Sequence, residues 1–126
     1  MSKANVELVK RGYAAITAGD LDAVGELMAP EIRWHAGDPD ARYACHNRKE
    51  ALAYMRARQT PGRIGRLLEV IDAGDRVVVI MQPPDEDGVT PPPRANVTTV
   101  RDGQIVEMVG FESPEAALDH AARKQS

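Results

Sequence analysis

The sequence has few of the residues that cross-link a chain or anchor it in a membrane. It has one cysteine in 126 residues, so no disulfide can form within the chain. Apolar runs such as Val77–Met81 are far too short to span a bilayer, and the N-terminal residues show no apolar leader. The net charge of −3 argues against nucleic-acid binding through bulk charge. We therefore expect a cytoplasmic protein that binds neither membrane nor nucleic acid.

Apolar residues recur at spacings of three and four in the first half of the chain, which predicts amphipathic helices. Asp20 is a suitable N-cap for the second helix, and Pro30 is expected to end it. Asn47 and Glu50 have the spacing of a capping box, which marks the start of the third helix. The three helices are expected at about 4–18, 20–29 and 47–58.

From residue 64 the apolar period changes to two, which is typical of strands. Turn residues at 73–75 and 101–103 divide this region into two hairpins. Segment 83–93 between them has five prolines, whose missing N–H groups exclude it from a sheet interior. Together with a strand at about 31–36 and a helix after Ser113-Pro114, this order predicts an α+β domain with a four-strand antiparallel core from 64 to 112.

Three segments resemble the nuclear transport factor 2-like superfamily, and within it the SnoaL-like branch of polyketide cyclases and ketosteroid isomerases. They read YAAITAGDLDAVGELMAPEIRW, GDRVVV and RDGQIVEMVGFESPEAAL, and they occur in the family's order. The resemblance implies one SnoaL-like domain over residues 1–126 with a cystatin-like fold. In this fold, a strongly curved, mainly antiparallel sheet wraps around N-terminal helices as a conical barrel and encloses one deep pocket.

Homodimerisation is expected from two observations. The resemblance implies it, because relatives commonly pair through the outer face of the sheet. The strands of this chain also carry apolar residues on both faces, and monomers rarely expose large apolar patches.

The catalytic residues of two kinds of relative are not matched. In ketosteroid isomerases the tyrosine donor, the general base and the second donor lie at positions that in this chain are Gly12, Ala36 and Asn96. Tyr13 is one position away from the first of these, about 100° around the helix. Limonene-epoxide hydrolases use two aspartates where this chain has Val78 and Gly110. Neither of these two mechanisms is therefore predicted.

The resemblance and the alternation of side chains along strands together identify the positions that face the expected pocket. His35 and Arg33 should point away from it. A partly desolvated carboxylate at Glu112 would suit proton transfer, while Asn96 could donate to a developing enolate oxygen. Glu112 could instead belong to the charged surface before the last helix. The remaining pocket walls are expected to be Trp34, Tyr54, Thr98 and Met108.

Residues 32–48 contain the only Trp, the only Cys and two of the three His. His35, Asp38 and His46 are of types that bind zinc, but their spacing matches no compact ligand motif, and surface or hydrogen-bonded histidines are the alternative. Cys45 fits a small, inert, buried thiol. An arginine cluster near the third helix could attract a phosphate or carboxylate, or could be a solvated face; it comprises Arg56, Arg58, Arg63 and Arg66.

Two functions remain open at this point. The chain could be an enzyme that performs acid/base isomerisation or cyclisation on a hydrophobic, carbonyl-bearing small molecule, with Glu112 and Asn96 as its catalytic residues. It could instead be a non-catalytic small-molecule-binding or accessory protein with the same pocket. The sequence shows no dinucleotide fingerprint, phosphate loop or metal motif, so we expect no cofactor and no metal.

Overall fold

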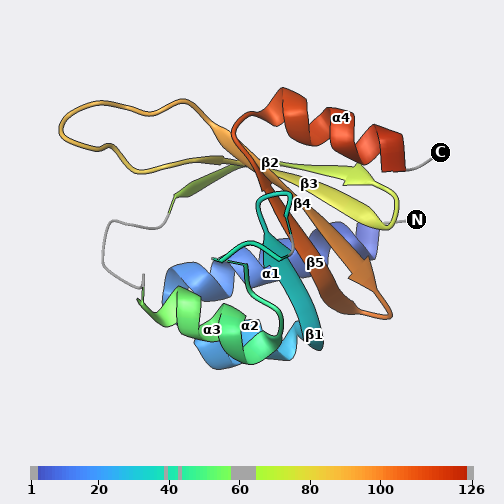
Figure 1. The fold of residues 1–126 in the computed structure, drawn as a ribbon. Helices are drawn as coiled ribbons and strands as arrows, with labels where there is room; N and C mark the ends of the chain where they lie inside the picture. The colour runs from blue at the N-terminus through green and yellow to red at the C-terminus, as the bar shows by residue number, and fades with distance from the viewer. Residues whose placement is uncertain (1–2, 39, 43, 58–64, 125–126) are drawn as a thin grey trace.

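The computed structural model describes residues 3–38, 40–42, 44–57 and 65–124. Its helices and strands follow the order expected from the sequence, with helices first, then strands, then a terminal helix (Figure 1). They are α1 (Lys3–Ala18), α2 (Leu21–Glu26), β1 (Met28–His35), α3 (Arg48–Ala57), β2 (Arg66–Ala73), β3 (Arg76–Gln82), β4 (Arg94–Arg101), β5 (Gln104–Phe111) and α4 (Pro114–Lys124).

The strands form one sheet in the order β1-β5-β4-β3-β2. The pairs β2–β3, β3–β4 and β4–β5 are antiparallel, which confirms the predicted antiparallel core. β1 runs parallel to β5. Gly74 and Gly103 have φ values of 85° and 77° in the two hairpin turns, a backbone conformation that glycine adopts without strain. Within the described residues β1 and β2 are the two edges of the curved sheet. The described sheet is therefore open, not closed into a complete barrel.

The predicted second helix, 20–29, is too long. α2 ends at Glu26, and Met28 already belongs to β1, where its Cα pairs with Ile105. Burial explains the difference, because Met28 is only 1 % exposed as part of the sheet. Pro30 therefore lies inside a strand, which is tolerated because β1 is an edge strand and its register shifts between Met28 and Arg33.

The sheet separates two apolar layers (Figure 1). Its inner face, defined by Val77, Val79 and Met108, packs against α1, α2 and α3. Its outer face, defined by Val78, Ile80 and Val97, packs against Ala117 and Ala121 of α4. The second apolar face of the strands is thus covered by α4 of the same chain. The apolar residues on both faces of the strands therefore no longer require a second copy of the protein. Homodimerisation itself stays a prediction.

The ends of the helices follow the predicted capping pattern. Asp20 accepts a hydrogen bond from the Ala23 N–H at 3.1 Å, and Asn47 accepts one from the Glu50 N–H at 2.8 Å. The Glu50 carboxylate reaches back to the His46 N–H at 2.8 Å, one residue earlier than in a standard capping box. This backbone hydrogen bond, together with the contact to the His46 ring, lowers the pKa of Glu50.

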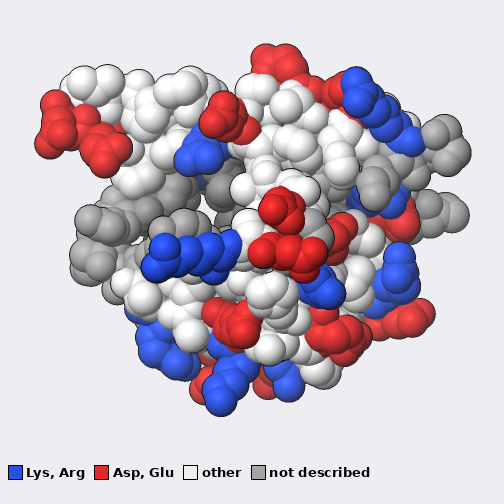
Figure 2. All heavy atoms as spheres, in the orientation of Figure 1, with Lys and Arg blue, Asp and Glu red and all other residues white. Residues whose placement is uncertain are grey.

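Both signs of charge are interspersed on the face of the molecule in Figure 2. The loop between β3 and β4 projects from the body (Figure 1), and it carries Asp85, Glu86 and Asp87, all exposed. Among the described residues no helix is long and apolar enough to cross a membrane.

Candidate functional site

Strand register decides which of the predicted site residues share a face. Asn96 pairs with Gly110, Thr98 pairs with Met108, and Trp34 also pairs with Met108 across the parallel contact between β1 and β5. Directly paired residues point to the same side of a sheet, so these side chains all lie on the inner face. The structure thus gathers Trp34, Asn96, Thr98 and Met108 as the alternation of the strands indicated.

Three polar side chains form a hydrogen-bonded chain on this inner face. The Thr98 Oγ1 hydroxyl donates to Asn96 Oδ1 at 2.7 Å, and Asn96 Nδ2 donates to the Tyr13 Oη at 2.9 Å. Thr98 is 2 % exposed and Asn96 is 7 % exposed, so two of the three members lie in the core of the protein. Buried polar groups are kept only when they are paired, and this chain pairs all three.

The direction of these bonds determines what Tyr13 can do. Its oxygen accepts from Asn96, so its hydroxyl hydrogen points elsewhere, and no acceptor for that hydrogen exists among the described residues. Burial raises the pKa of Tyr13, and the hydrogen bond from Asn96 offsets only part of that effect. The phenol is therefore neutral at physiological pH and retains one hydrogen to donate.

Tyr13 is a candidate site residue that the sequence comparison did not select. A side chain at Gly12, the aligned position, would meet Leu27 of the following segment at 3.6 Å from its Cβ, so that position faces α2. The side chain that reaches β4 is the next one along α1. The helical periodicity could have indicated that Tyr13 faces the core, because it lies on the apolar stripe of this helix with Val9 and Ile16.

Several large side chains of the inner layer are not fully buried. Trp34 and Tyr54 meet edge to face with their ring centroids 5.0 Å apart. These two and several more residues of the inner layer remain partly accessible to solvent although they pack on the core, namely Tyr13, Leu52, Met55, Leu67 and Met81. The inner layer therefore presents partly exposed aromatic and apolar side chains as well as the polar chain.

Glu112 is not part of this arrangement. It lies in the bend between β5 and α4, and its side chain is exposed. The enclosed carboxylate expected from the sequence is therefore not seen at this position, because β5 ends at Phe111 before the alternation reaches residue 112. A catalytic role for Glu112 stays a prediction.

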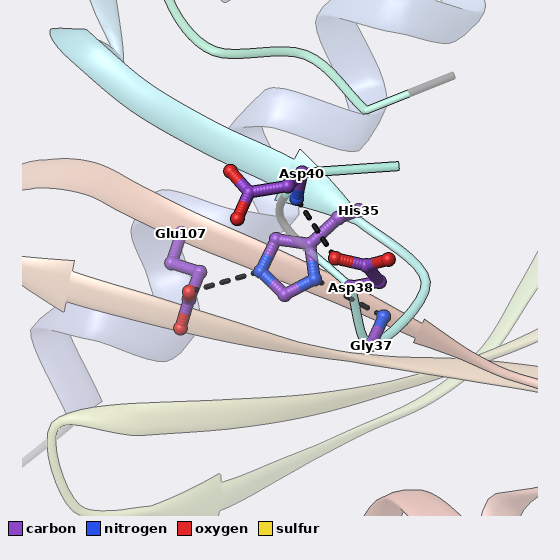
Figure 3. Close-up of polar contacts among 5 residues, drawn as sticks. All are labelled: His35, Gly37, Asp38, Asp40 and Glu107. Carbon is purple, nitrogen blue, oxygen red and sulfur yellow. Dashed lines mark hydrogen bonds and ion pairs between the residues drawn. The ribbon is translucent and has the colours of Figure 1, made fainter. Parts of the chain in front are cut away.

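His35 points away from the inner face, as predicted, and makes its contacts on the outer face of the sheet (Figure 3). Its Nε2 lies 3.1 Å from Oε2 of Glu107, and its Nδ1 accepts a hydrogen bond from the Gly37 N–H at 3.1 Å. The side chain of His35 is 7 % exposed, against 39 % for Glu107. His35 is thus a hydrogen-bonded histidine.

The other reactive residues of segment 32–48 have structural surroundings. His46 contacts Glu50 through Nδ1 at 3.1 Å, and Cys45 is buried and pairs its backbone with Trp34. In the described part of the chain, no group of three or more His, Cys, Asp or Glu side chains is placed to hold a metal ion. Of the arginine cluster, Arg56 and Arg66 are exposed, whereas Arg58 and Arg63 lie outside the described residues.

A shallow, open depression of about 350 Å³ lies beside the projecting loop. Its walls belong to the ends of β2 and β3 and to the loop itself, namely Arg66, Gln82, Pro83, Pro84, Asp85 and Thr90. Arg66 belongs to the predicted arginine cluster, whereas none of the residues predicted for the small-molecule pocket lines this depression.

Comparison with protein families and solved structures identifies relatives of the chain. A family model described as the SnoaL-like domain matches residues 9–108. No curated protein matches the sequence. A structure from Sinorhizobium meliloti, described as a candidate polyketide cyclase, is 20 % identical with a TM-score of 0.69, and the match covers 83 % of this chain and 94 % of that one.

Two further solved structures are similar. Bal32a, from a soil-derived mobile gene cassette, is 23 % identical with a TM-score of 0.74 over 94 % of this chain and 96 % of its own. TerC, co-crystallised with polyporic acid, is 23 % identical with a TM-score of 0.66 over 95 % of this chain and 99 % of its own. At such identities the likeness concerns the fold.

Proposed function

Because the chain belongs to the SnoaL-like domain family, we propose that it binds a hydrophobic small molecule that carries a carbonyl or related oxygen. The compound would lie against the inner face of the sheet, between β4 and the aromatic pair of Trp34 and Tyr54. One observation carries this proposal, namely the hydrogen-bonded chain from Thr98 through Asn96 to Tyr13, which ends in a hydroxyl hydrogen without an acceptor among the described residues.

The polar chain favours an oxygen-bearing ligand for a physical reason. The Tyr13 hydroxyl hydrogen has no acceptor among the described residues, and a hydrogen bond from it to a ligand oxygen would contribute about 0.5–1.5 kcal/mol. Asn96 and Thr98 fix the position of the Tyr13 oxygen, so the hydroxyl hydrogen is presented in a defined direction. The partly exposed apolar side chains around it would bury a hydrophobic skeleton.

The descriptions of similar proteins agree with this chemistry. One similar structure is described as a candidate polyketide cyclase, and another was co-crystallised with polyporic acid. We carry over only the broad class of ligand, a hydrophobic compound with polar oxygens.

Binding of a matched pair of compounds tests the proposal. Anthraquinone has carbonyl oxygens that anthracene lacks, and Trp34, the only tryptophan, provides a fluorescence signal on the inner face. We expect the wild type to prefer the quinone, and Tyr13→Phe to reduce that preference about two- to tenfold while leaving the affinity for anthracene unchanged. Equilibrium dialysis gives the same constants independently of fluorescence. Equal preference in both proteins, or no binding of oxygenated polycyclic compounds, would contradict the proposal.

An isomerase or cyclase activity is the second candidate, favoured by the pair of Tyr13 and Asn96, which could stabilise a developing oxyanion. Its base would be Glu112, as the sequence comparison indicated. On this hypothesis Glu112→Gln abolishes turnover and leaves stability nearly unchanged, whereas Asn96→Ala lowers the rate by about two to three orders of magnitude. Turnover that survives Glu112→Gln would exclude Glu112 as the base.

A further inference from the structure

The ring of His35 connects two parts of the chain that are distant in sequence. It lies at the end of β1 on the outer face of the sheet, where Nε2 contacts Glu107 on β5 at 3.1 Å (Figure 3). Its other nitrogen, Nδ1, receives the Gly37 N–H from the turn that follows β1, also at 3.1 Å. The imidazole therefore ties this turn to the neighbouring strand.

The contacts define the protonation state of the ring. A backbone N–H can only donate, so Nδ1 must carry a lone pair towards Gly37. The ring hydrogen is then on Nε2 and is donated to the Glu107 carboxylate, which gives a neutral imidazole with both nitrogens used. A second proton has only Nδ1 to bind, where it would face the Gly37 N–H.

Charged groups near the ring would compensate an imidazolium. β5 provides Glu107, the turn provides Asp38 and Asp40, and β1 provides Arg33 two residues earlier on the same face. The side of α4 that packs on the sheet carries Ala117, Ala121 and the titratable His120, whose ring centroid lies 5.0 Å from that of Phe111 on β5. In Figure 3 the Asp38 carboxylate lies on the Nδ1 side of the ring and Glu107 on the Nε2 side. A carboxylate thus lies on each nitrogen side of the imidazole.

We infer that His35 is a proton-sensitive positioning residue that holds the turn at Gly37 only while its ring is neutral. When Nδ1 takes up one proton from solvent, the lone pair that accepted the Gly37 N–H is lost. The new Nδ1–H then donates to the Asp38 carboxylate, which at present accepts the Asp40 N–H at 2.9 Å. The contact between Nε2 and Glu107 persists through the change.

This exchange would be transmitted to the inner face, a step that rests on the proposed function. The chain returns from the turn to Cys45, whose backbone pairs with Trp34 through hydrogen bonds of 3.0 and 2.8 Å. The ring of Trp34 contacts Tyr54 beside the proposed ligand position. Release of the turn would weaken the pairing of Cys45 with Trp34 beside the proposed ligand position. Ligand affinity should therefore fall when His35 is protonated.

Nuclear magnetic resonance of the full chain without ligand tests the inference directly. The imidazole ¹⁵N signals report the tautomer and the titration of His35, and the Gly37 amide signal reports its hydrogen bond. We expect the hydrogen on Nε2 at high pH, and one common midpoint for His35 and the Gly37 amide. The Val100 amide, bonded to Asp75 O at 2.9 Å, serves as a reference that should not change. A Gly37 amide signal that does not change when His35 is protonated would overturn the inference.

Two substitutions of the histidine separate its two contacts. In His35→Asn the amide oxygen can occupy the place of Nδ1, so Gly37 should keep its hydrogen bond at all pH values. In His35→Gln the amide extends towards Glu107, so Gly37 should lack the bond at all pH values. Neither variant titrates, so a pH-dependent Gly37 signal in His35→Asn would contradict the assignment.

Charge removal provides a further check. Glu107→Gln keeps an acceptor for Nε2–H but removes one compensating charge, so the midpoints of His35 and Gly37 should move together to lower pH. His46→Gln, in which an exposed histidine near Glu50 is replaced, should leave both midpoints in place. Movement of only one midpoint after Glu107→Gln would show that the two events are not linked.

Ligand binding gives the last comparison. We expect the affinity of the wild type for anthraquinone to fall about two- to tenfold across the His35 midpoint and to stay constant in His35→Asn. If the ring and Gly37 titrate together but no ligand binds, the proposed function fails and the inference on His35 stands. If ligands bind with an affinity that is independent of the titration, the coupling to the inner face fails.

Discussion

Tyr13 illustrates at the scale of one residue how the fold gives a common side chain a special property. Burial disfavours the tyrosinate anion more strongly than the hydrogen bond from Asn96 stabilises it, and the pKa of Tyr13 is raised as a result. The residue is thus held as a neutral donor, while Asn96 and Thr98 fix its oxygen. A site built in this way offers a hydrogen bond but no negative charge.

The raised pKa of Tyr13 predicts a loss of stability in alkali. Because the folded-state value lies above the usual 10.0, the contribution to stability is complete below about pH 10 and disappears as the pH rises through the folded-state value. The free energy of unfolding of the wild type should therefore fall more steeply above about pH 10 than that of Tyr13→Phe. Urea denaturation at a series of pH values measures this, and tyrosinate absorbance assigns the transition. Parallel profiles for both proteins would contradict it.

Site residues on strands could be predicted from the sequence, whereas those that depend on distant contacts could not. Alternation along β4 and β5 is a local property, so Asn96, Thr98 and Met108 were assigned to the correct face. Tyr13 meets a residue 83 positions away, and which side of α1 faces β4 depends on how the helix packs. The contact between His35 and Glu107 spans 72 positions and has no local signal.

At the scale of elements, local chemistry and burial decided different boundaries. α3 begins where its cap predicts, because Asn47 satisfies an amide that the helix itself cannot pair. The end of α2 was mispredicted, because the spacing of Leu27 and Met28 suits a helix until the pairing with β5 places Met28 in a strand. Pairing partners are distant in sequence, so helical periodicity alone does not report them.

The cap of α3 predicts a measurable loss of stability. Asn47→Ala leaves the Glu50 N–H without its acceptor, and the free energy of unfolding should fall by about 1 kcal/mol. Asn5→Ala is a suitable control, because Asn5 is only partly buried and its hydrogen bond to Gly74 O is long, at 3.4 Å. We expect the control to change stability by less than about 0.5 kcal/mol in chemical denaturation. Equal effects of the two substitutions would argue against the cap.

At the scale of the whole molecule, α4 determines what the outer face presents. Ala117 is 0 % exposed and Ala121 is 2 % exposed, and both lie over buried valines of β3 and β4. Small side chains let the helix approach the sheet closely. α4 of the same chain therefore covers much of the outer face. Among the described residues, the large hydrophobic side chains that remain exposed are Leu68, Val89 and Leu118.

Substitutions on two faces of α4 test this cover. Ala117→Glu would place an unpaired charge against the outer face, and we expect the free energy of unfolding to fall by about 2 kcal/mol or more. Ala116→Glu makes the same chemical change one residue earlier on the exposed side of the helix, and it should be nearly neutral. A similar loss of stability in both variants would show that α4 does not pack as described.

The predicted homodimer is tested by sedimentation at micromolar concentration. A dimer would have twice the 13.7 kDa mass of the chain. Because α4 covers much of the outer face, such a dimer would have to use α4 itself or surface beyond it. Ala116→Glu, on the exposed side of α4, should then weaken association. A mass of one chain for the wild type would contradict dimerisation.

The parallel contact between β1 and β5 has a consequence for the order of events during folding. β1 is complete at residue 35, but its partner strand begins only at residue 104. On a ribosome the first strand therefore emerges long before it can be paired. The hydrogen bond from Asn96 to Tyr13 joins residues that are also far apart, by 83 positions. Contacts of such separation form slowly, since the entropy of closing a long loop must be overcome before they contribute. The inner face is thus among the last parts of the protein to be assembled, and the newly made N-terminal segment must remain unaggregated until its partners arrive.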